Sequence, residues 1–193
     1  MINLKDNDLV FAKVKPNAII PSKEDENAGY DIYACFNEDY MVIPGHSTRL
    51  IPTGIASAMT EKYYLQVHER GSTGTKGMKY GAGVIDSGYR NEIFICINNV
   101  NYKDIIISKL DKDKLFEKYT TKDCDGTPGI KYGDGEYDYV YDFEDVIIYP
   151  YEKAIAQLIV HEVPKMNVSE IPYDELKGIP SKRGMGALGS SGK

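Results

Sequence analysis

The stretch from residue 81 to residue 94 constrains the fold more than any other part of the chain. Two short apolar runs, Val84-Ile85 and Ile93-Phe94, flank a polar segment that contains Ser87-Gly88. Apolar runs on either side of a glycine-containing turn are typical of a β-hairpin. The stretch therefore predicts two strands joined by a turn.

The same stretch carries groups that suit ligand binding. Asp86 stands where the first predicted strand enters the turn, and Tyr89 follows three residues later. Gly81 and Gly83 precede this strand, and a backbone without side chains lets a flat ligand approach its N–H and C=O groups. Taken alone, an Asp in a turn more often caps its own backbone, and a Tyr there more often packs on a neighbour. The functional interpretation depends on whether other segments agree with it.

Length and composition limit the class of protein. The 193 residues suit one domain, or one domain with an elaboration. The net charge of −6 argues against a nucleic-acid partner, and no apolar run approaches the roughly 18 residues that suggest a membrane helix. Three irregularly spaced cysteines argue against a disulfide framework or a zinc site and favour a reducing, cytoplasmic location. Sixteen tyrosines, no tryptophan and many Ile, Val and Thr residues favour β-structure.

Alternating apolar residues predict further strands on both sides of this stretch. We expect one strand at 9–15, a strand pair within 48–59, one strand at 63–68, and a return to strand at 146–163.

A loop rich in glycine and hydroxyl groups follows the strand predicted at 63–68. Residues 69–77 combine Arg70, Gly71 and Ser72 with further Thr and Gly residues. Bare N–H groups, hydroxyl donors and a guanidinium suit a phosphate, although such a turn is often only a loop. The spacing is not that of a Walker loop.

Two later segments offer groups of the same kind. Gln157 is the lone polar side chain in the apolar run 154–160, so it is either a hydrogen-bonded core residue or a phosphate ligand. The glycine-rich tail, residues 181–193, is either a frayed terminus or an arm that becomes ordered on a triphosphate.

Taken in order, five segments resemble the five signatures of the trimeric deoxyuridine triphosphatases (dUTPases). They are Ala28-Gly29-Tyr30-Asp31-Ile32, the loop at Arg70, Gly83-Val84-Ile85-Asp86-Ser87-Gly88-Tyr89-Arg90, Ala154-Ile155-Ala156-Gln157-Leu158, and the tail from Arg183. Three positions depart from the family pattern. Gly71 replaces a Ser, Ala154 replaces a basic residue, and Leu188 replaces the Phe that lies over the uracil ring. Leucine excludes water there but offers no π face for stacking.

The resemblance implies an all-β, distorted jelly-roll-like barrel that forms a homotrimer with shared active sites. It implies that the protein hydrolyses dUTP to dUMP and pyrophosphate, with Asp86 as the general base for the attacking water. Mg²⁺ would be held mainly by the substrate phosphates, and Asp31 would reach it only through water. The implied substrate-binding residues are Arg70, Gly71, Ser72, Gly83, Val84, Ile85, Tyr89, Phe94, Gln157, Arg183, Leu188, Gly189, Ser190 and Ser191.

More residues separate the third and fourth signatures than in most of the family, which implies an insertion at about 101–141. This segment contains a predicted helix at 112–119, and an acidic, tyrosine-rich run at 133–145 overlaps its end. We interpret the insertion as a solvated appendage on a single domain of residues 1–193. The alternative is a docking arm for a protein partner, because tyrosines flanked by acidic residues can form an interface.

Two other functions stay open. dCTP deaminase resembles dUTPase in fold and in the loop and third signatures, but it needs a carboxylate at the position that aligns with Cys96. The second alternative is a regulatory protein that senses the nucleotide and acts through the insertion.

Overall fold

The computed structural model describes residues 3–122, 128–130, 146–182, 184 and 186. The chain divides into a larger unit, residues 1–163, and a smaller one, residues 164–193. Within the described ranges, no helix is both long and apolar enough to span a membrane.

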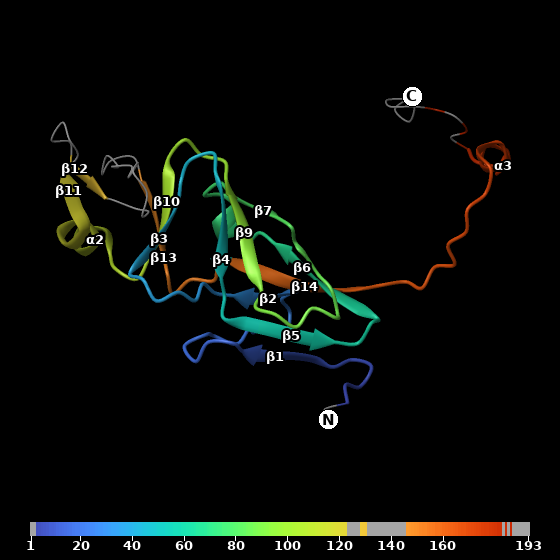
Figure 1. The fold of residues 1–193 in the computed structure, drawn as a ribbon, viewed down its shortest axis with the longest axis horizontal. Helices are drawn as coiled ribbons and strands as arrows, with labels where there is room; N and C mark the ends of the chain where they lie inside the picture. The colour runs from blue at the N-terminus through green and yellow to red at the C-terminus, as the bar shows by residue number, and fades with distance from the viewer. Residues whose placement is uncertain (1–2, 123–127, 131–145, 183, 185, 187–193) are drawn as a thin grey trace. The chain divides into compact units, whose positions relative to one another are not determined.

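Strands dominate the larger unit (Figure 1). In chain order its elements are β1 (Leu9–Lys13), β2 (Gly29–Ile32), β3 (Tyr40–Ile43), β4 (Thr48–Pro52), β5 (Ile55–Met59), β6 (Tyr63–His68), α1 (Gly71–Gly74), β7 (Met78–Gly81), β8 (Val84–Ile85), β9 (Phe94–Asn99), β10 (Asp104–Ser108), α2 (Lys112–Tyr119), β11 (Thr120–Lys122), β12 (Pro128–Ile130), β13 (Val146–Pro150) and β14 (Ala156–Glu162). The mainly β fold predicted from the sequence is confirmed.

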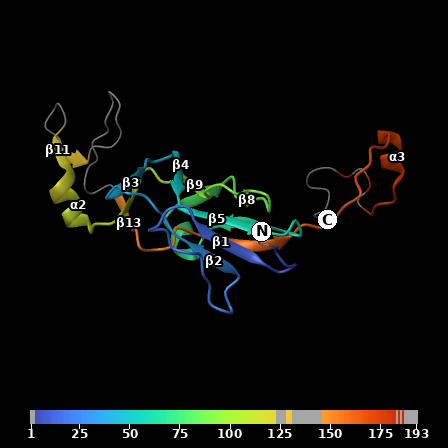
Figure 2. The same ribbon diagram turned by 60° about the horizontal axis from the view of Figure 1, so that its bottom comes forward.

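Three sheets form the body of the larger unit. Their strand orders are β2-β14-β6-β8, β4-β9-β7 and β13-β10-β3. Side chains alternate along the strands, so Leu65 and Val67 of β6 and Ile95 and Ile97 of β9 point into one shared core. Strands β1 and β5 form an antiparallel pair and lie side by side in both views (Figures 1 and 2).

The strands expected at 9–15 and 63–68 are present as β1 and β6. Within 48–59 the two expected strands exist, but the prediction that they pair with each other is wrong. Strand β4 pairs with β9, and β5 pairs with β1. Gly54, between them, has a φ of 66°. Its N–H and C=O bond to Glu92 and Val14 rather than closing a hairpin.

The hairpin expected within residues 81–94 is also wrong. The first apolar run, β8, pairs with β6, whereas the second run leads into β9 of another sheet. The reason lies at the ends of the connection, because Ile85 and Ile93 are both buried and Ile93 N donates to Ile55 O at 2.7 Å. The turn 53–55 therefore bonds to the start of the second run, which pairs in another sheet and not with the first run.

The insertion expected at 101–141 is only partly an appendage. Strand β10 is the central strand of its sheet, and Ile105, Ile106 and Ile107 are all fully buried. Ile105 and Ile107 face the main core, while Ile106 faces a second cluster. A strand covered on both faces needs consecutive apolar residues, so the solvated interpretation is wrong for this part.

The helix expected at 112–119 is confirmed as α2. Asp111 caps it by accepting from Lys114 N at 2.9 Å. Leu115 of α2 joins the second cluster with Val42, Ile106 and Ile130. Residues 123–127 and 131–141 of the insertion, and all of the acidic run at 133–145, lie outside the described residues.

The smaller unit has its own short helix, α3 (Tyr173–Gly178), in which no residue is buried. The described side chains of residues 164–182 are exposed, among them Met166 and Val168. The tail residues Arg183, Leu188, Gly189, Ser190 and Ser191 lie outside the described residues.

Candidate functional site

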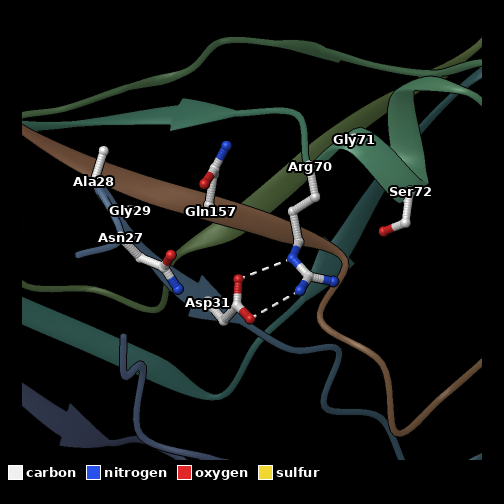
Figure 3. A pocket seen from close by; sticks show the side chains of 8 residues that line it. All are labelled: Asn27, Ala28, Gly29, Asp31, Arg70, Gly71, Ser72 and Gln157. Carbon is white, nitrogen blue, oxygen red and sulfur yellow. Dashed lines mark hydrogen bonds and ion pairs between the residues drawn. The ribbon is translucent and has the colours of Figure 1, made fainter. Parts of the chain in front are cut away.

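A cavity of about 420 Å³ brings together residues from three of the five signature-like segments (Figure 3). We call it the Arg70 pocket. It is lined by Asn27, Ala28, Gly29, Asp31, Arg70, Gly71, Ser72 and Gln157. The sequence analysis implicated five of these residues in substrate or metal binding, namely Asp31, Arg70, Gly71, Ser72 and Gln157.

Strand pairing explains how residues so far apart in the sequence meet. Strand β14 lies between β2 and β6, and Gln157 is opposite both Asp31 and His68. Side chains directly opposite each other share a face of the sheet. Arg70 follows β6 by two residues and so lies beside them (Figure 3).

Gln157 is half-buried, and its Nε2 donates to Glu69 O at 2.7 Å. A Cβ at Gly29 would lie 2.7 Å from Gln157 Oε1. The glycine therefore makes room for the amide beside the pocket.

Arg70 and Asp31 form a two-pronged ion pair across the pocket (Figure 3). Arg70 Nε lies 2.8 Å from Asp31 Oδ1, and Nη2 donates to Oδ2 at 3.0 Å. A carboxylate accepts about four hydrogen bonds and a guanidinium donates five, so neither group is saturated. Sequence reasoning implicated both residues but did not predict that they bond to each other.

The loop after Arg70 forms the single helical turn α1. Thr73, which is buried, accepts from Arg70 N and donates to Arg70 O, both at 3.0 Å. Ser72 is exposed and lines the pocket. A Cβ at Gly71 would meet no atom within 4 Å, so the family's usual Ser at this position would fit without a steric conflict.

Two tyrosine hydroxyls hold the chain where it enters β14. Tyr149 Oη donates to Ala154 O at 2.7 Å, and Tyr80 Oη donates to Ile155 O. A free phenol is already protonated at neutral pH, and burial raises the pKa of both groups further, so both can donate here. Ala154, where the family pattern has a basic residue, is 3% exposed and contributes its backbone carbonyl to this anchor.

Four residues of the third signature, Val84, Ile85, Asp86 and Tyr89, line a second cavity of about 280 Å³. We call it the Asp86 pocket. It is lined by Leu50, Ala82, Val84, Ile85, Asp86, Tyr89, Ile93 and Phe94. Sequence reasoning missed Leu50, which is 58% exposed. Leu50 reaches this pocket because β4 pairs with β9, which places Leu50 opposite Cys96. The sequence does not reveal that pairing.

Gly83 lies next to the Asp86 pocket rather than among the residues that line it. Its carbonyl accepts from Val67 N at 2.8 Å. A Cβ at this position would lie 2.6 Å from Gln66 Nε2 and 3.2 Å from Val67 O, so a larger residue would displace the Gln66 amide and crowd the backbone. One of the two acceptor positions on the Gly83 carbonyl is therefore already used within the sheet.

The Arg70 pocket and the Asp86 pocket have no lining residue in common. Within one protomer the structure gathers the signature residues into two separate groups. In the described part of the chain, no cluster of three or more His, Cys, Asp or Glu residues is suited to a metal ion. The aligned deaminase position is Cys96, a half-buried free thiol on β9.

A family model described as dUTPase matches residues 15–112, about half of the chain. The chain belongs to the dUTPase family. The match ends at Lys112, the first residue of α2.

Two relatives extend this result. The deoxyuridine 5'-triphosphate nucleotidohydrolase of Leptospira interrogans is 33% identical over 99 residues, covering 49% of this chain and 68% of that protein. The protein of the same name from Candida albicans is 29% identical over 180 residues, covering 92% and 84%.

The solved structures agree on the fold. The Staphylococcus bacteriophage 80alpha dUTPase with dUPNHPP superposes with a TM-score of 0.66 at 23% identity, covering 97% of this chain and 99% of that one. The jelly-roll-like dUTPase fold predicted for this family member is confirmed.

Proposed function

We propose that this dUTPase-family protein hydrolyses dUTP to dUMP and pyrophosphate in nucleotide metabolism. The observation that carries the proposal is the Arg70 pocket, where three separate signature-like segments converge. Arg70, Ser72 and Gln157 supply guanidinium, hydroxyl and amide groups there, which suit phosphate oxygens. Two relatives, 33% and 29% identical to this chain, are named for the same activity.

Asp86 is the proposed general base. Its side chain is exposed and lines the second pocket beside Tyr89. A carboxylate there would orient a water for in-line attack on the α-phosphorus and accept its proton as pyrophosphate leaves. Tyr89 would pack against the deoxyribose, and backbone groups near Gly83, Val84 and Phe94 would read the pyrimidine.

The donor set fits a magnesium ion that is carried mainly by the substrate. Mg²⁺ keeps several of its waters and typically takes one or two carboxylates plus phosphate oxygens. Asp31 would reach the ion only through water, using lone pairs that its two bonds to Arg70 leave over. When bound, the ion would neutralise charge that develops on the phosphates.

We also propose that the protein works as a homotrimer with shared sites. Bound dUTP would place its base in the Asp86 pocket and its phosphates in the Arg70 pocket. These two pockets have no lining residue in common. Pairing the Asp86 pocket of one copy with the Arg70 pocket of the next would complete the site. The tail of a third copy, with Arg183, Leu188, Gly189, Ser190 and Ser191, would cover the triphosphate. The free thiols Cys35 and Cys96 fit the cytoplasmic location proposed from the sequence.

The variant Asp86→Asn tests the function. We expect turnover of dUTP to fall by about 10²- to 10⁴-fold, the range that general base catalysis typically contributes. Binding of the analogue dUpNHpp should persist, because the exchange removes a charge but keeps the shape.

The matched control is Asp113→Asn, which neutralises an exposed carboxylate on α2 and should leave turnover unchanged. Equal rates for wild type and Asp86→Asn would remove Asp86 from the base role. Release of ammonia from dCTP in place of pyrophosphate from dUTP would contradict the proposed reaction.

A further inference from the structure

The connection between β8 and β9, residues 86–93, carries both Asp86 and Tyr89. We call it the Asp86 loop. It joins strands of two different sheets, so no ladder of hydrogen bonds holds it along its length. Its first half is a turn in which Tyr89 N donates to Asp86 O at 3.0 Å. Both side chains are exposed, so their position depends on how the second half is anchored.

Glu92 makes that anchor. Its side chain is only 14% exposed, and its Oε1 accepts from Gly54 N at 2.7 Å and lies 3.3 Å from Lys15 Nζ. Hydrogen bonds to an ionised group are stronger and shorter than neutral ones. The backbone carbonyl of Glu92 also accepts from Tyr89 Oη at 2.9 Å. One residue thus ties the loop to the barrel and Tyr89 to the loop.

The partner of Glu92 is itself held firmly. Gly54 has a φ of 66°, and a Cβ on it would lie 2.8 Å from Ala18 Cβ. Its carbonyl accepts from Val14 N at 2.7 Å. The Gly54 N–H therefore points from a defined place in the fold toward the loop.

The residue after Glu92 is held by the same turn. Ile93 N donates to Ile55 O at 2.7 Å, and Ile93 O accepts from Thr53 Oγ1 at 2.6 Å. The turn 53–55 therefore grips the end of the Asp86 loop through three consecutive residues.

We propose that Glu92, bonded to Gly54 N–H, is a positioning residue that sets where Asp86 and Tyr89 lie in the active site. This inference rests on the proposed function of Asp86. Glu92 is absent from the residues that the family signatures imply for substrate binding, and it acts through the loop rather than by touching substrate.

The variants Glu92→Ala and Glu92→Gln test the proposal. Ala removes the acceptor, and we expect kcat to fall on the order of 10²-fold, the effect of misplacing a catalytic group by about 1 Å. Gln keeps an oxygen that accepts from Gly54 N–H, so kcat should stay within about fivefold of wild type. Affinity for dUpNHpp should fall less than kcat, because the proposed phosphate-binding residues lie in the Arg70 pocket and only the proposed deoxyribose contact of Tyr89 lies on the loop.

Leu115→Ala is the control for a purely structural effect. Leu115 is fully buried in the second cluster, so its loss destabilises the fold without touching the Asp86 loop. If Leu115→Ala lowers Tm as much as Glu92→Ala but keeps kcat, the positioning role is supported. Equal kcat losses in both variants, or a Glu92→Gln variant as impaired as Glu92→Ala, would overturn it.

Amide hydrogen exchange separates this inference from the proposed function. In Glu92→Ala, the amides of residues 87–93 should exchange faster, while those of β6 and β14 stay protected. Faster exchange without any dUTP turnover by the wild type would mean that the anchor exists but the proposed function is wrong. Unchanged exchange in an active enzyme would overturn the anchor and leave the function standing.

Discussion

At Asp104, burial and charge oppose each other. The carboxylate begins β10 and accepts from Gly45 N at 2.6 Å, an interaction that favours the ionised form. Burial outweighs this bond and raises the pKa of Asp104 above its usual value. The hydrogen bond therefore supports the turn at Gly45 at the cost of a partly buried charge.

This conflict predicts a pH-dependent effect of Asp104→Asn. Because the folded pKa is above the unfolded one, ionisation weakens the fold as pH rises through that pKa, and there is no penalty below the unfolded pKa of about 3.8. Asn keeps an oxygen for Gly45 N–H and never ionises. We expect the Tm of Asp104→Asn to exceed that of wild type at pH 7, with a difference that shrinks toward pH 4. A difference that is constant or grows on acidification would contradict this account.

At the scale of elements, α2 contacts the barrel through buried Leu115, through Phe116 and Tyr119 beside it, and through two hydrogen bonds to Asp39. Leu115 packs with Val42, Ile106 and Ile130. Asp39, in the loop before β3, accepts from Lys118 Nζ at 2.6 Å and from Tyr119 Oη at 2.8 Å. These bonds lower the pKa of Asp39, so their contribution is lost as pH falls below the usual range of a carboxyl.

We therefore expect Leu115→Ala to lower the free energy of unfolding by about 2–5 kcal/mol, the usual cost of a large-to-small change in a core. Urea denaturation measures this change, with Lys114→Ala as control because its side chain is exposed on the same helix. The control should change stability by less than about 0.5 kcal/mol. If Leu115→Ala also lowers the free energy of unfolding by less than about 0.5 kcal/mol, α2 does not depend on the second cluster for its stability.

The inserted segment also connects two parallel strands, β10 and β13. Strands β10 and β13 are parallel, with Asp104 opposite Val146 and Ser108 opposite Pro150. Parallel neighbours need a crossover of about a dozen residues or more. The chain between residues 109 and 145 supplies that crossover, so it cannot be replaced by a tight turn.

For the whole molecule, the separation of the two pockets leads to a test by complementation. Asp86→Asn inactivates one pocket and Arg70→Ala the other, so each variant alone should be inactive. If sites form between copies, co-assembled variants regain activity wherever an intact Asp86 pocket meets an intact Arg70 pocket. With equal, random mixing about a quarter of all sites are intact. Because homotrimers of either variant contain none of them, about a third of the sites in purified mixed trimers should be active.

Co-expression with two affinity tags isolates the mixed assemblies, and light scattering gives their mass. Unmixed variants, combined only after purification and kept from exchanging subunits, are the control. No recovery in a verified mixed trimer would place both pockets of each working site in the same protomer.

Much of the local chemistry was readable from the sequence. Strands β1 and β6 and helix α2 were predicted from local sequence patterns, which depend on neighbouring residues. Asp31, Arg70, Ser72 and Gln157 were implicated because short segments around them resemble family motifs, and the fold places all four around one pocket. What a segment is made of and which groups it can present are properties that short stretches of chain carry by themselves.

Which segments pair with which was decided by the tertiary structure. The run at Val84 was expected in a hairpin, but it pairs with β6. Ile105, Ile106 and Ile107 were expected in a solvated appendage, but they are buried in the core. Leu50 and Glu92 gained their roles only through contacts with residues about 40 positions away. Burial and hydrogen bonding between distant residues select one set of pairings from many with similar local preference, and no short stretch of sequence encodes that selection.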